Sequence, residues 1–183
     1  MIKKVILGIV VFIIVIVLGF CAIVAMQPAD YTVSRSATVN APPEKVFEQV
    51  NDFHKWEGWS PWAKLDPAMK TTYSGPESGT GAAYAWTGNN EVGEGKMTIA
   101  ESHPSQHVKI NLEFIKPFQA TNVTEFTFKP EGDKTTVTWT MSGHNNFVGK
   151  AFGLMMNMDK TIGGDFEKGL AQMKAAAEST PKQ

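Results

Sequence analysis

The stretch that decides the fold is Tyr31–Trp62, which reads YTVSRSATVNAPPEKVFEQVNDFHKWEGWSPW. Its first nine residues place Tyr31, Val33, Arg35, Ala37 and Val39 in alternation with serine and threonine. Such alternation with β-branched residues predicts a strand. Pro42 and Pro43 then suit the first turn of a helix, because the N–H that proline lacks would be unpaired there. Asn40 is a candidate N-cap for that helix.

A short helix and an aromatic turn follow the prolines. Val46, Phe47 and Val50 stand at helical spacing and give the helix one apolar face. Four large rings come next along the chain: Phe53, Trp56, Trp59 and Trp62. Two interpretations of the three tryptophans stay open. They close one end of the sheet as core residues, or they line a cavity mouth that faces a membrane, since tryptophan is favoured at membrane interfaces.

Six further strands are predicted downstream, at residues 69–73, 82–86, 91–101, 107–115, 120–129 and 134–142. The clearest is 107–115, in which Val108, Ile110, Leu112 and Phe114 alternate with polar residues, as in a half-buried antiparallel strand. The connections are short, and parallel pairs would need long crossovers. The sequence therefore predicts an antiparallel meander.

From Val148 the hydrophobic period becomes helical. The expected apolar stripe consists of Leu154, Met158, Ile162, Phe166, Leu170 and Met173. Gly163 and Gly164 fall inside this helix, where each glycine costs about 1 kcal/mol of helix stability. Either the helix bends there, or another group packs very close to it.

The quoted stretch, the run of strands and the ending MDKTIGGDFEKGLAQMK (158–174) together resemble the helix-grip superfamily, also called SRPBCC or START-like. Within it, the chain is most similar to polyketide cyclase/dehydrase-type members. The resemblance covers about residues 31–177. It implies an α+β fold in which a curved, seven-stranded antiparallel sheet wraps around a long C-terminal helix, with an apolar cavity between them. Most resembling proteins bind hydrophobic small molecules or lipids, and some carry out chemistry in the cavity.

The expected organisation is an N-terminal transmembrane anchor and linker at 1–29, a helix-grip domain at 30–178 and a tail at 179–183. Residues 5–26 carry no charge, and about 20 apolar residues suffice to cross the hydrocarbon core. A cleaved signal peptide is the alternative, although its apolar region is usually about 7–15 residues long. Lys3 and Lys4 precede the span, which predicts a single-pass protein of the plasma (inner) membrane. Its N-terminus would be cytoplasmic and its domain would lie on the outer, periplasmic or extracytoplasmic side.

The remaining composition argues against several classes of function. There are 17 basic and 18 acidic residues, whereas nucleic-acid binding needs a basic surface, so no nucleic-acid partner is expected. Cys21 lies in the apolar run, which leaves the domain without a disulfide or a catalytic thiol. The four histidines lack metal-ligand spacing, and His103 and His107 flank Pro104, which rules out helical geometry for that pair. We therefore predict no cofactor, no metal and no catalytic residue.

The candidate ligand-binding residues are large apolar side chains expected on inward-facing positions of the strands and the closing helix. They are Tyr84, Trp86, Met97, Phe114, Phe126, Trp139, Met141, Met158 and Ile162. Met155 and Met156 would also suit an adaptable apolar lining. The same residues could instead form a solid core, and their spacing does not distinguish the two. The leading hypothesis is a membrane-anchored protein that binds a hydrophobic small molecule or lipid. A cavity enzyme of the cyclase or dehydratase type and a protein–protein adaptor remain as alternatives.

Overall fold

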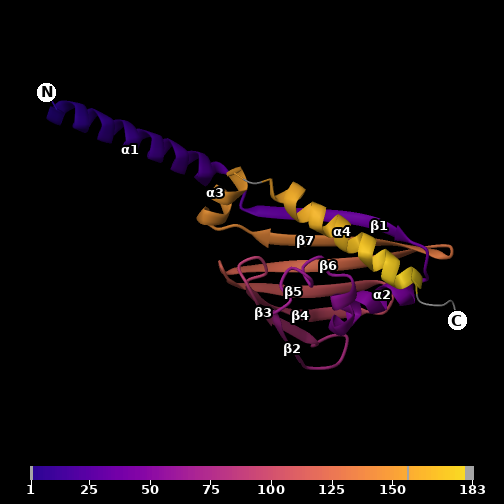
Figure 1. The fold of residues 1–183 in the computed structure, drawn as a ribbon. Coiled ribbons are helices and arrows are strands. Elements are labelled where there is room, and N and C mark those ends of the chain that lie inside the picture. The colour runs from indigo at the N-terminus through magenta and orange to yellow at the C-terminus, as the bar shows by residue number, and fades with distance from the viewer. Residues whose placement is uncertain (1, 156, 180–183) are drawn as a thin grey trace.

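The structure, a computed structural model, describes residues 2–155 and 157–179. A long N-terminal helix projects from a domain made of one sheet with helices on one face (Figure 1). The helices are α1 (Ile2–Met26), α2 (Pro43–Asn51), α3 (Phe147–Met155) and α4 (Met158–Ser179), with a 3₁₀ helix, η1 (Phe53–Gly58), after α2. The strands are β1 (Asp30–Val39), β2 (Lys70–Ser74), β3 (Ala83–Thr87), β4 (Glu94–His103), β5 (His107–Lys116), β6 (Ala120–Glu131) and β7 (Lys134–His144). This confirms the predicted α+β helix-grip fold.

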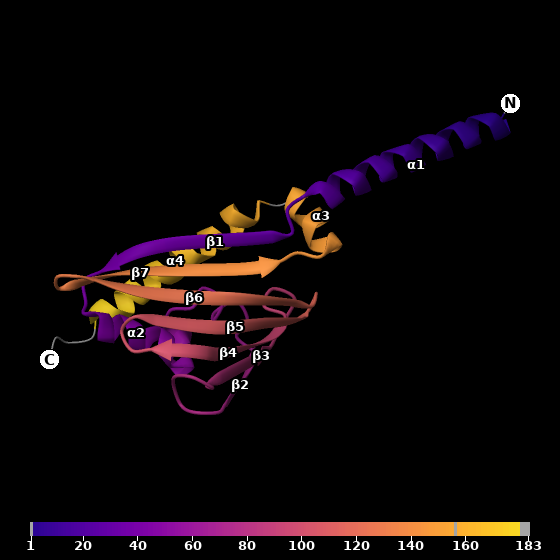
Figure 2. The same ribbon diagram turned by 180° about the vertical axis from the view of Figure 1, so that it is seen from behind.

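The seven strands form one antiparallel sheet in the order β1-β7-β6-β5-β4-β3-β2. Strands β2 to β7 follow one another as a meander, and the first strand pairs with the last, as the view from behind shows (Figure 2). Three hydroxyl pairs connect β1 to β7 on the outer face: Ser34 with Thr140, Ser36 with Thr138, and Thr38 with Thr136, at 2.8–3.2 Å. Cross-strand serine and threonine pairs stabilise a sheet, which explains why both strands alternate apolar residues with these two types.

The C-terminal helical region differs from the single helix that the hydrophobic stripe predicts. It is divided into α3 and α4, and each helix begins at an asparagine cap. The Asn146 side chain accepts a hydrogen bond from the Gly149 N–H, and the Asn157 side chain accepts one from the Lys160 N–H, both at 2.9 Å. Capping of this kind starts a new helix. Met156 lies outside the described residues, as does the predicted tail beyond Ser179.

Asn40 does not cap α2, contrary to expectation. The cap position is Pro42, which makes no side-chain cap hydrogen bond. Asn40 instead donates from its backbone N–H and its side-chain amide to Glu178 Oε1, at 2.7 and 2.8 Å. The residue therefore ties the end of β1 to the last turn of α4.

Helix α4 covers the inner face of the sheet, and it makes its tightest contact from Phe166 onward. Phe166, Leu170 and Met173 are buried there. Phe166 stacks on Trp139 of β7 with ring centroids 4.0 Å apart and planes at 9°. Trp139 in turn stacks on Phe126 of β6 at 4.9 Å. These aromatic contacts join the helix to the centre of the sheet and form the middle of the core.

Substitutions at two glycines of α4 test how closely the helix packs against the sheet. A β-carbon at Gly169 would lie 2.8 Å from Cζ3 of Trp139, whereas nothing lies within 4 Å of one at Gly164. Gly164→Ala should raise the free energy of unfolding by up to about 1 kcal/mol, because alanine is the better helix former. Gly169→Ala should lower it by about 1–3 kcal/mol through overpacking, despite the same gain in helix propensity.

Chemical denaturation of the full chain in detergent micelles, followed by far-UV circular dichroism, measures both changes. Shifts of the same sign would show that α4 does not rest on Trp139 at Gly169.

Candidate functional site

The predicted lining residues divide into a buried set and a half-buried set. Met97, Phe126, Trp139 and Met141 are buried in the core. The half-buried residues are Tyr84, Trp86, Phe114, Met158 and Ile162. The buried set includes the residues at the centre of the aromatic stack, so that part of the inner face is a packed core. The half-buried set is the part of the prediction that still offers apolar surface to a ligand.

Two half-buried residues of the sheet, Trp86 and Phe114, lie toward the end from which α1 leaves, which we call the α1 end. There Asp30 pairs with His144, and Asn122 pairs with Gly143. Trp86 is paired with Gly95, and Gly95 with Phe114, which places both rings near the ends of their strands. On the helical side, Met158 begins α4 and Ile162 lies one turn further on. The opposite end of the inner face is closed by α2 and η1.

Trp86 is held firmly by its surroundings. The ring lies over Gly95, where a β-carbon would be only 2.5 Å from the indole. The indole N–H donates to the Val92 carbonyl at 2.9 Å, and Phe114 makes an edge-on contact at 6.0 Å. Glycine at position 95 therefore lets the indole lie flat on β4 and present a fixed apolar surface.

Tyr84 adds a polar group to this set. Its ring contacts Phe53 of η1 and stacks on Trp86, with centroids 6.0 and 5.9 Å apart. Burial, together with the nearby Tyr73 and Glu57, raises the pKa of Tyr84 to about 12. The phenol therefore stays protonated at neutral pH and can donate a hydrogen bond.

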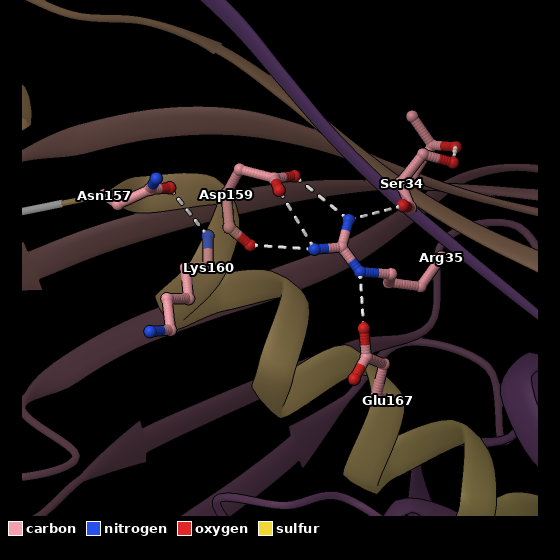
Figure 3. A network of polar contacts seen from close by, with 7 residues as sticks. Ser34, Arg35, Asn157, Asp159, Lys160 and Glu167 are labelled. Atoms are coloured by element: carbon pink, nitrogen blue, oxygen red, sulfur yellow. Dashed lines mark hydrogen bonds and ion pairs between the residues drawn. The ribbon is translucent and has the colours of Figure 1, made fainter.

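The N-terminal half of α4 is attached to β1 by ion pairs centred on Arg35 (Figure 3). The guanidinium donates to both carboxylate oxygens of Asp159 at 3.0 and 3.1 Å, and to Glu167 at 2.8 Å. It also donates to the backbone carbonyl of Asp159 at 3.0 Å. A β-carbon at Gly163 would collide with this guanidinium. The close neighbour expected at the glycine pair is therefore a side chain of the sheet.

These ion pairs shift the pKa values of the groups that they join. The hydrogen bonds that Arg35 donates to Asp159 and Glu167 raise the pKa of Arg35, and the bond from Arg35 lowers the pKa of Asp159. A carboxyl group with a depressed pKa contributes stability above its unfolded pKa and loses it as the pH falls through its folded pKa. This attachment therefore persists at neutral pH and weakens only in acid.

The two tryptophan interpretations are resolved residue by residue. Trp56 and Trp59 are buried, and their indole N–H groups donate to the carbonyls of Val50 and Gln49 at the end of α2. They are core residues that attach η1 to α2. Trp62 is only partly buried and packs against Trp139 and Phe166 at 5.9 and 6.5 Å.

One buried polar atom lacks a partner among the described residues. No described group accepts a hydrogen bond from the indole N–H of Trp139. The residue is only 2 % exposed, so this donor is also shielded from water. A buried donor without an acceptor costs about 1–3 kcal/mol. Such a donor could be satisfied by an acceptor on a bound molecule.

Two open recesses on the described residues are lined differently from the predicted site. One, of about 610 Å³, lies between α2, η1 and the end of α4 and is lined largely by charged side chains, including Lys55 and Glu57. The other, of about 390 Å³, lies where β1, β6 and β7 meet at the α1 end. Neither recess is lined by a predicted ligand-binding residue.

A possible metal-binding group lies on the β4–β5 hairpin. Ligand atoms of Glu101, His103 and His107 lie within 4.8 Å of one another. The turn pairs His103 with His107 across the hairpin, so the four-residue spacing brings them together without a helix. Helical spacing, the geometry considered for the sequence, does not predict this proximity. Lys109 Nζ lies 3.3 Å from Glu101 and competes with a cation. Glu101 and His103 lie on the face of β4 opposite to Ser102. The Ser102 hydroxyl donates to Asn51 of α2, so the histidine group lies on the face that α2 does not cover.

Comparison with known proteins identifies the family of the domain. A model of the family described as polyketide cyclase / dehydrase and lipid transport matches residues 30–178. The chain belongs to this family. No curated protein matches the chain.

Solved structures of low sequence identity share the fold of this polyketide cyclase/dehydrase family domain. Protein CV1439 from Chromobacterium violaceum is 14% identical with a TM-score of 0.59, covering 82% of this chain and 98% of its own. KanY is 14% identical with a TM-score of 0.61, covering 82% and 99%. DynU16, a putative protein in the dynemicin biosynthetic locus, is 16% identical with a TM-score of 0.56, covering 81% of this chain and 47% of its own. At these identities the likeness concerns the fold alone.

Two buried tryptophans provide a matched test of the unpaired indole. Trp59→Phe removes a hydrogen bond to Gln49, whereas Trp139→Phe removes a donor without a described acceptor. Both changes remove similar ring volume. We expect Trp59→Phe to lower the free energy of unfolding by about 0.5–1.5 kcal/mol more than Trp139→Phe, because only the former removes a hydrogen bond, to a partly buried carbonyl.

Denaturation of the full chain in micelles measures this difference. Equal losses would show that the Trp139 N–H has an acceptor in solution.

Proposed function

We propose that the chain is a membrane-anchored binding protein for a hydrophobic small molecule or lipid. The molecule would contact the half-buried apolar residues at the α1 end, between β3–β5 and the start of α4. The observation that carries the proposal is that Tyr84, Trp86, Phe114, Met158 and Ile162 remain incompletely buried on a face that is otherwise closed. Ligand sites are mostly apolar with a few polar groups. The Tyr84 phenol supplies such a group here.

The position of α1 supports the anchoring part of the proposal. Among the described residues, Ile2–Met26 is the one helix long and apolar enough to cross a membrane, although a signal sequence has the same character. Most of its side chains are exposed, and only Val24 is buried. Residues 27–29 separate α1 from β1. A retained anchor would therefore hold the α1 end of the domain close to the bilayer, with the N-terminus in the cytoplasm by the charge rule.

The attachment of α4 offers a route for entry of the ligand. From Phe166 onward the helix is fixed by buried packing on the sheet, whereas its first turns are attached through Arg35 to the exposed carboxylate of Asp159. Glu167, the second partner of Arg35, lies next to Phe166. Ion pairs to solvent-exposed partners contribute little to stability. The first turns of α4 can therefore move away from β1 at a smaller cost than the rest of the helix.

The cyclase or dehydratase alternative rests on the family description. The described residues include one buried carboxylate, Asp66, and both of its oxygens accept backbone N–H groups, from Ala68 and Asn89, at 2.9 and 2.7 Å. Asp66 therefore stabilises the loops that contain Ala68 and Asn89. Binding without chemistry accounts for the site with fewer assumptions.

Native mass spectrometry of the full chain, released from detergent micelles, tests the proposed binding. The wild-type chain should carry an apolar molecule as added mass. Ile162→Trp places a large indole ring among the half-buried residues. The bound mass should be lost in this variant, because the indole and the apolar molecule compete for the same space. Thr161→Trp is the matched control, since Thr161 is exposed on the same turn.

The control should keep the bound mass. No added mass on the wild type, or identical behaviour of the two variants, would contradict the proposed site. Circular dichroism establishes that both variants remain folded.

A further inference from the structure

An apolar surface at the α1 end is not explained by ligand binding inside the domain. It consists of Phe118 in the β5–β6 turn together with Phe147, Val148, Phe152 and Leu154 of α3, and we call it the apolar platform. These side chains are between 41 and 61% exposed. Phe118 and Phe152 contact each other, with ring centroids 5.7 Å apart, so the turn and the helix form one surface. A continuous apolar surface on a soluble domain usually marks an interaction site.

The spacing of apolar residues along α3 gives the platform one apolar side. At about 100° per residue, positions 147, 148, 152 and 154 fall within one broad stripe of the helix. Gly149, Lys150 and Gly153 occupy the rest of the circumference. The segment 145–156 contains no acidic residue. Helix α3 is therefore a short amphipathic helix whose apolar stripe does not face the core of the domain.

The platform lies beside the end of the candidate membrane anchor. Helix α3 packs against α1, and Figures 1 and 2 show the two meeting at the same corner of the domain. Lys150 Nζ donates to the carbonyl of Ala25 at 3.4 Å, and the Asn145 N–H donates to the carbonyl of Ala29 at 2.8 Å. Residues 27–29 can span at most about 10 Å when extended. The platform thus lies next to the exposed apolar surface of α1.

We propose that the apolar platform lies in the interfacial region of the same bilayer that α1 enters. This inference rests on the anchoring part of the proposed function. Amphipathic helices that lie on membranes bury their apolar face about 5–10 Å into the boundary between headgroups and acyl chains. The short link to α1 holds the platform at that depth. A bilayer is favoured over a protein partner because the platform lies beside α1, an apolar helix whose side chains are mostly exposed.

Docking through the platform has a consequence for ligand access. The β5–β6 turn that carries Phe118 follows directly from the strand that ends with Phe114 and Lys116. Burying Phe118 in the interface would therefore turn the α1 end of the inner face toward the bilayer. A lipid-like molecule could then pass between the membrane and the half-buried residues without crossing water.

Spin labels on the full chain in phosphatidylcholine vesicles test this orientation. Cys21 is first changed to Ser, and single labels are then placed at Phe152→Cys on the platform, at Leu18→Cys within α1, and at Lys129→Cys as a water-exposed control at the far end of the sheet. Power-saturation electron paramagnetic resonance compares access of apolar oxygen with access of a polar nickel chelate. The labels at Phe152→Cys and Leu18→Cys should both favour oxygen several-fold over the label at Lys129→Cys.

The other outcomes separate the platform from the anchor. If the label at Leu18→Cys favours oxygen while the one at Phe152→Cys favours the nickel chelate, the platform is in water and the inference is wrong, although the anchor stands. If both labels favour the nickel chelate, the anchoring proposal itself fails. If the label at Phe152→Cys is shielded from both reagents, a second copy of the chain or another protein covers the platform, and the inference is again overturned.

Discussion

The fold depends on the contact between Phe166 of α4 and Trp139 of β7. A sheet with one apolar face needs a second layer to cover it, and in this chain α4 is the long helix that does so. The two rings stack at 4.0 Å, and glycine at position 169 lets the helix approach closely enough for that stacking. Because Trp139 also stacks on Phe126, one ring transmits the helix contact to the neighbouring strand. The centre of the expected cavity is consequently occupied by aromatic side chains.

Helix α4 is therefore attached to the sheet by different contacts along its length. From Phe166 onward the helix is buried against the sheet, whereas its first turns are attached through Arg35 to the exposed carboxylate of Asp159. Ile162 lies on the turns of α4 that have this weaker attachment, and Trp86 lies near the α1 end of β3. Under the proposed function this is the end held next to the bilayer by α1. The same geometry thus relates ligand entry, membrane anchoring and the position of the apolar platform.

Much of the fold follows from local patterns, and much of the site does not. Alternation in residues 107–115 and 134–142 predicts their strands because successive side chains of a strand point to opposite faces. The same alternation cannot distinguish Trp139, which is buried, from Trp86, which is not, since burial depends on where α4 crosses the sheet. The break near Asn157 was missed because an asparagine caps a helix only when the backbone around it allows. The His103–His107 pair was missed because the hairpin supplies a proximity that helical spacing does not.

The central claim is that an apolar molecule reaches the inner face from the bilayer at the α1 end. Photo-crosslinking of the full chain in nanodiscs that contain a diazirine-bearing fatty acid tests it most directly, with labelled peptides identified by mass spectrometry. We expect label in α1 and, in addition, on the strands that carry Trp86 and Phe114 and on the first turns of α4. Label confined to α1 and α3 would contradict the claim, because it would show that membrane lipid surrounds the anchor without entering the domain.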